Sequence, residues 1–87
     1  MRDNHQIMLK KKLQLKRGQK LGPLELERKG HRDEEDIYRC DVIDAKGLKV
    51  GTVTHTAITS VWPPIRTDHW LVQRDLDGNV IVEERWR

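Results

Sequence analysis

The 87-residue sequence has few of several residue types that often determine a fold. Its one cysteine, Cys40, cannot form a disulfide within the chain, and a reducing compartment is the simplest setting for it. Phenylalanine is absent and there are only three tryptophans and one tyrosine, so bulky core residues are scarce. No apolar run approaches the ~20 residues that span a bilayer, and residues 1–5 lack the start of a secretory signal. We therefore expect a cytoplasmic protein with no membrane contact.

Charge is present in excess and is segregated along the chain. Residues 1–32 carry ten Lys/Arg and three Asp/Glu, a net charge of +7, whereas residues 33–87 sum to −4. All four aromatic residues lie in the second part. Because residues 1–20 also lack a clear apolar period, we predict a basic mobile N-terminal arm over 1–20 and a small domain over 21–87. A small core gives little stability, and association with a second copy would bury more apolar surface, so a homodimer is one expected assembly.

Alternation of apolar and polar residues indicates β-strands after residue 21. The strands are expected over residues 24–28, 37–44, 48–56, 67–74 and 80–86. Turn residues at 44–47 join the second strand to the third, and those at 75–79 join the fourth to the fifth. Two adjacent prolines keep the segment Val61-Trp62-Pro63-Pro64 out of a central strand. Residues 57–66 around it are expected to form either a long β-arch or a short helical turn. No amphipathic helix separates the strands, which indicates an antiparallel arrangement.

The fold class that follows is mainly β: a small antiparallel meander of four to five strands that can close into an SH3-like or OB-like barrel. The pattern Asp44-x-x-Gly47-x-x-Val50-Gly51-x-Val53 resembles the strand–turn–strand phrase of PRC-barrel domains and other small SH3-like barrels. This resemblance spans residues 44–53 only, and the later Trp-Pro-Pro stretch departs from that family. It implies a small barrel and transfers no functional residue.

The basic arm is the candidate nucleic-acid site. Its clustered cations are Lys10, Lys11, Lys12, Lys16 and Arg17. Each could neutralise a phosphate and release a counterion, which would make binding salt-dependent. The same charges would serve equally well as a solubilising tail, and no recognition helix or zinc-ligand spacing accompanies them.

The candidate protein-binding site is the segment Trp62-Pro63-Pro64, because two prolines hold its tryptophan in a loop. Trp70 and Trp86 are expected to supply most of the core, since phenylalanine is absent. Their acidic neighbours would repel phosphates, which argues against a stacking platform for bases.

Histidine and cysteine offer the remaining chemistry. His55, His69, Cys40 and Asp68 could meet across strands, but no metal-ligand spacing occurs and nothing indicates an oxyanion hole. Cys40 is expected to be a small buried hydrophobic residue. We therefore expect no metal, no cofactor and no enzymatic activity.

Two functions stay open on this basis. The first is a small non-enzymatic accessory module that contacts nucleic-acid phosphates through the basic arm. The second is a protein-interaction or inhibitor module, of the small kind carried by phages and mobile elements, that uses the sheet edge and the Trp62-Pro63-Pro64 loop.

Overall fold

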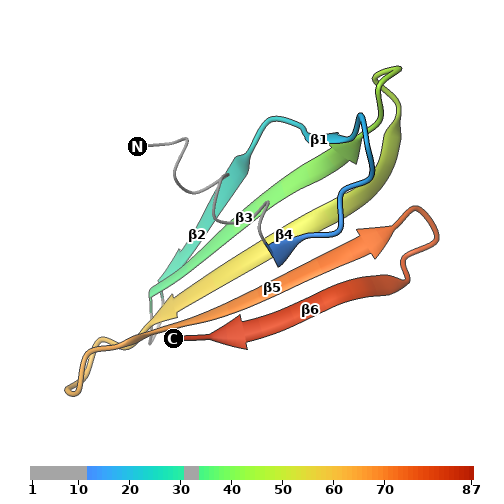
Figure 1. Ribbon diagram of the computed structural model, residues 1–87. Coiled ribbons are helices and arrows are strands. Elements are labelled where there is room, and N and C mark those ends of the chain that lie inside the picture. Colours follow the sequence, from blue (N-terminus) through green and yellow to red (C-terminus); the bar gives the residue numbers. More distant parts are fainter. Residues whose placement is uncertain (1–11, 31–33) are drawn as a thin grey trace.

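The computed structural model describes residues 12–30 and 34–87, which form one antiparallel sheet (Figure 1). Its strands in chain order are β1 (Lys20–Leu21), β2 (Glu25–Gly30), β3 (Glu34–Ile43), β4 (Lys49–Thr59), β5 (Thr67–Asp75) and β6 (Val80–Trp86). Within those two ranges, no helix is long and apolar enough to cross a membrane.

The strand order confirms the predicted meander. It is β1-β3-β4-β5-β6, and β2 also pairs with β3, alongside β1. The predicted turns join β3 to β4 and β5 to β6, and Gly47 takes a φ of 82°, which favours glycine. In β4, a side chain at Gly51 would collide with the carbonyl oxygen of Arg74, so the backbones of β4 and β5 approach closely at this glycine.

The sheet is open, so the predicted closure into an SH3-like or OB-like barrel is wrong. Closure requires the last strand to pair with the first, whereas β6 pairs with β5 alone among the described strands. The first two strands instead occupy the same side of β3, and β1 offers only two residues of edge. The sheet therefore keeps two outer edges.

The main core cluster lies on one face of the sheet, whereas Ile37 and Val72 are buried on the other face. Its buried members are Leu13, Cys40, Val42, Val53 and Leu71. Cys40 and Val53 lie directly opposite each other on β3 and β4, and Leu71 on β5 is 0% exposed. Strand alternation places these side chains on the same face, as the sequence pattern predicts.

Residues 12–16 cover this core face, so the described part of residues 1–20 is not a free, mobile arm. Figure 1 shows the segment in front of the sheet, before it turns into β1. Leu13 is buried, and Leu15 packs against the core cluster. The Gln14 N–H donates to Gln73 Oε1 at 2.8 Å, and Gln73 Nε2 donates to the Gln14 carbonyl at 2.9 Å. The physical reason is that a single sheet without phenylalanine needs apolar cover from elsewhere.

The tryptophans contribute less to the core than expected. Trp86 is partly buried against the core cluster, but Trp70 on the opposite face is 41% exposed. Small aliphatic side chains fill the core instead, because the leucines of residues 13–24 reach it. The expectation that Trp70 is a main core residue is therefore wrong.

Candidate functional site

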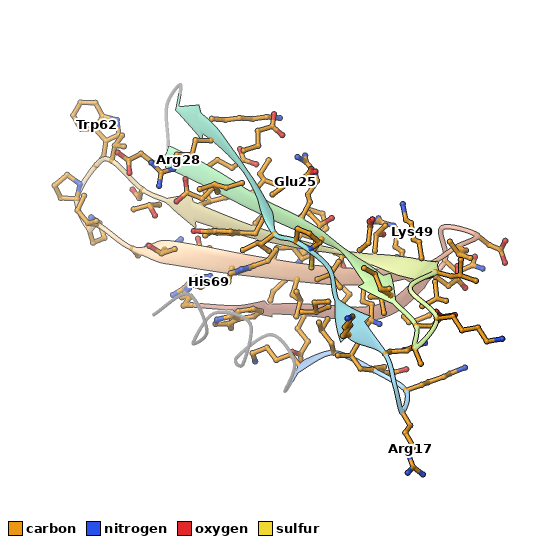
Figure 2. The ribbon with its side chains drawn as sticks, turned by 90° about the horizontal axis from the view of Figure 1, so that it is seen from above. Arg17, Glu25, Arg28, Lys49, Trp62 and His69 are labelled. Carbon is orange, nitrogen blue, oxygen red and sulfur yellow. The ribbon has the colours of Figure 1, made fainter. Side chains whose placement is uncertain are left out.

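The loop of residues 60–66, here called the Trp62 loop, connects β4 to β5 and projects beyond the end of the sheet (Figure 2). At its base, the Ser60 N–H donates to the Arg66 carbonyl at 2.9 Å, and the Thr59 and Thr67 hydroxyls lie 3.0 Å apart. The Ser60 hydroxyl also donates to the Trp62 carbonyl at 2.9 Å. These bonds give the loop a defined shape, and two prolines restrict its backbone further.

The Trp62 loop presents apolar side chains to solvent. Trp62 is 75% exposed, Ile65 is 62% exposed and Val61 is 43% exposed. Isolated exposed apolar residues are ordinary, but here three occur within five positions on one projecting loop. Pro63 and Pro64 are exposed between them, so the predicted site residues Trp62, Pro63 and Pro64 lie together at this tip.

Charge of both signs lies near the loop. Asp68, at the start of β5, lies 3.7 Å from the Arg66 guanidinium and 3.4 Å from that of Arg87. Because all three groups are about half exposed or more, these ion pairs contribute little stability. They give the base of the loop a mixed polar rim around an apolar tip.

Of the cations in the predicted nucleic-acid site, the three that the structure describes do not form one surface. Lys10 and Lys11 lie outside the described residues. Lys12 Nζ is 3.5 Å from a Glu84 carboxylate oxygen and 4.5 Å from the Trp86 ring centroid, so its charge is already engaged. Lys16 and Arg17 are exposed in a turn closed by the Gln19 N–H, which donates to the Lys16 carbonyl.

That turn lies at the other end of the sheet from Trp62, as the labels of Arg17 and Trp62 show (Figure 2). A side chain at Gly18 would come 3.2 Å from the Ala45 Cβ, so the turn packs against the β3–β4 turn. Lys20 and Lys46 are exposed in the same neighbourhood. For the part of the chain described, no ion pair is formed by Lys16, Arg17, Lys20 or Lys46.

A row of stacked rings crosses the core-side face. His55 Nε2 and His69 Nδ1 lie 3.0 Å apart, and the His69 and Trp86 ring centroids are 5.0 Å apart at 8°. Tyr38 stacks on His55 with centroids 5.5 Å apart. His55 is only 2% exposed, so the row serves packing more than contact with a ligand. The register between β4 and β5 brings His55 close to His69, and the spacing of the two histidines in the sequence could not predict this contact.

The other chemical candidates are dispersed. Cys40 is buried as expected, and this burial, with a smaller effect of Asp41, raises the pKa of its thiol to about 11. The thiol is therefore protonated at neutral pH and is a poor nucleophile. Asp68 faces arginines, and no group of three potential metal ligands occurs in the two described ranges.

Trp70 forms a second exposed aromatic site, on the face opposite the core. Its indole N–H donates to Glu83 Oε2 at 2.8 Å, and the Arg85 guanidinium lies 4.9 Å from its ring centroid. The sequence shows that Glu83 and Arg85 share one face of a strand, but it does not show that Trp70 lies beside them. That contact depends on the register between β5 and β6. A carboxylate beside the indole makes this surface unsuited to phosphate.

Comparison with known proteins adds no assignment: no family model, no curated protein and no solved structure matches the chain.

Proposed function

We propose that this protein is a small non-enzymatic binding module that holds a partner protein through the Trp62 loop. The observation that carries this proposal is a tryptophan 75% exposed at the tip of a hydrogen-bonded, proline-containing loop. Tryptophan is enriched among the residues that dominate binding energy at protein interfaces. A tryptophan side chain can bury roughly 150–250 Å², and Trp62 is 75% exposed, so covering it would contribute roughly 3–5 kcal/mol before the costs of association.

The loop is suited to this role because little of it has to be ordered on binding. Its ends are fixed by the Ser60–Arg66 backbone hydrogen bond and by the Thr59–Thr67 hydroxyl contact. Preorganisation of this kind reduces the entropy lost on association. The partner should offer an apolar pocket for the indole and a polar rim of mixed charge, which matches Arg66 and Asp68 at the base of the loop.

Photo-crosslinking tests the proposal even though the partner has not been identified. A photoreactive phenylalanine analogue is placed at Ile65, which leaves Trp62 intact, and the protein is expressed in cells of its source organism. We expect one discrete adduct of higher mass, identified by mass spectrometry, and its loss when Trp62→Ala is added. Leu76, 63% exposed in the β5–β6 turn, is the matched control position and should give no such adduct. The same adducts at both positions, or adducts insensitive to Trp62→Ala, would contradict the proposal.

A second candidate function rests on the cations at the opposite end. Lys16, Arg17, Lys20 and Lys46 are exposed, and the described ion pairs do not include them. They could neutralise phosphates of a nucleic acid, although Asp44 and Asp77 in nearby turns reduce the local charge.

Fluorescence polarisation with mixed DNA and RNA at low salt tests this second candidate. If it is correct, Lys16→Ala with Arg17→Ala should weaken binding equally for all sequences and reduce the log–log salt slope by about 2. Trp62→Ala should leave that binding unchanged. Absence of binding by the intact protein at low salt would exclude the candidate.

A further inference from the structure

The two outer edges of the sheet differ in chemistry. All six residues of β2 are exposed and four are charged, which is a common protection against pairing with another strand. By contrast, β6 begins with three consecutive apolar residues, of which Val80 is 49% exposed and Ile81 is 41% exposed. Among the strands described, only β5 pairs with β6, so its outer side has no strand partner there. Such an edge is a template for strand addition.

We propose that β6 pairs with β6 of a second copy of this chain, antiparallel and centred on Glu84, so that two sheets join into one. The two-fold axis would run through the sheet at Glu84. A contact of this kind is isologous: each residue at position 84 + n faces the residue at position 84 − n of the second copy. The strand that binds to the β6 edge is therefore β6 of the second copy.

The charge pattern of β6 is complementary to itself in this register. Glu83 would face Arg85 of the second copy, and Arg85 would face its Glu83, which gives two ion pairs across the new strand boundary. Both residues lie on one face of the sheet, since Glu83 is opposite Val72 and Arg85 is opposite Trp70. Opposite charges directly across an antiparallel pair are favourable, whereas like charges are unfavourable.

The other face of the new boundary would be apolar. Val82 and Trp86 lie on the core side of β6, opposite Gln73 and His69 of β5. About the same centre, Val82 would face Trp86 of the second copy, and the reverse pair would form by symmetry. An aliphatic side chain against an aromatic one is a stabilising cross-strand pair.

The central pair of identical carboxylates has a counter-ion available. Glu84 would face Glu84 of the second copy, but Lys12 Nζ already lies 3.5 Å from the Glu84 carboxylate, so each copy supplies one cation there. Moving the centre by one residue would place Glu83 opposite Glu83 or Arg85 opposite Arg85, away from Lys12. The centre at Glu84 is therefore the register that the charges favour.

Charge reversal tests both the association and its register. Sedimentation velocity of the full chain over a concentration series should show a monomer–dimer equilibrium. Glu83→Arg and Arg85→Glu should each weaken the dimer by at least about tenfold, because they place like charges opposite each other. An equimolar mixture of the two variants should associate, since the cation introduced by Glu83→Arg would then face the carboxylate introduced by Arg85→Glu. The double variant should dimerise alone, and circular dichroism confirms that each variant is folded.

Glu25→Arg and Lys29→Glu on β2 are the matched controls, and they should leave the equilibrium unchanged. A wild-type chain that stays monomeric at all concentrations would overturn the proposal, and so would folded single variants whose mixture fails to associate. If Glu83→Arg fails to fold because Trp70 loses its hydrogen-bond acceptor, Glu83→Gln and Arg85→Glu decide the question, and both must weaken the dimer. The test is independent of the Trp62 loop, because Trp62→Ala should not alter self-association.

Discussion

Removing residues 1–16 should lower the free energy of unfolding by about 3–5 kcal/mol more than removing residues 1–11. The difference isolates residues 12–16. Burial of Leu13, which is 9% exposed, contributes roughly 2 kcal/mol, and the two hydrogen bonds between Gln14 and Gln73 contribute about 1 kcal/mol each. Removal of residues 12–16 also exposes part of the core face around Val42 and Val53 to solvent.

Urea unfolding followed by tryptophan fluorescence measures both truncations, since all three tryptophans are retained. The 1–11 deletion is the control, because it leaves every described contact in place. Equal stabilities for the two truncated chains would show that Leu13 and Gln14 add nothing to the fold, and the segment would then be a free arm after all.

Leu71→Ala should destabilise the protein by about 3–4 kcal/mol, a large part of the stability of a small domain. Leu71 is 0% exposed at the centre of the sheet, between His55 on β4 and Glu84 on β6. Paired strands on both sides prevent the backbone from collapsing into the cavity that the substitution leaves. The melting temperature should fall by roughly 4–8 °C for each kcal/mol lost.

Leu76→Ala is the matched control for that substitution. It removes the same atoms from a side chain that is 63% exposed, so stability should change by less than about 0.5 kcal/mol. Calorimetry of both variants gives the comparison. Similar melting temperatures for the two would contradict the placement of the core on this face.

The two turns, and the strands that they join, could be predicted from the sequence because they depend on hydrogen bonds between neighbouring residues. The Asp44 carboxylate accepts the N–H groups of Lys46 and Leu48, and the Asp75 carboxylate accepts those of Asp77 and Asn79. The bond from Asn79 lowers the pKa of Asp75 below its ordinary value. Both turns are thus closed by residues within a few positions of each other, which a sequence pattern records directly.

Two predictions that were wrong, the free arm and the closed barrel, depend on contacts between residues far apart in the chain. Gln14 and Gln73 are 59 positions apart, and nothing near Leu13 indicates that the opposite half of the chain needs cover. Barrel closure likewise depends on whether the first and last strands meet. Exposure of Trp62, by contrast, follows from Pro63 and Pro64 beside it, so the sequence predicts the loop even though it does not identify a partner.

Binding of a partner protein through the Trp62 loop is tested most directly by calorimetric titration of the partner identified by crosslinking. Trp62→Ala should weaken binding by about 2 kcal/mol or more, which is roughly thirtyfold or greater. Leu76→Ala, and the double variant Lys16→Ala with Arg17→Ala, should stay within about twofold of the unmodified protein. An unchanged affinity for a folded Trp62→Ala variant, or a greater loss on neutralising Lys16 and Arg17, would contradict binding through this loop.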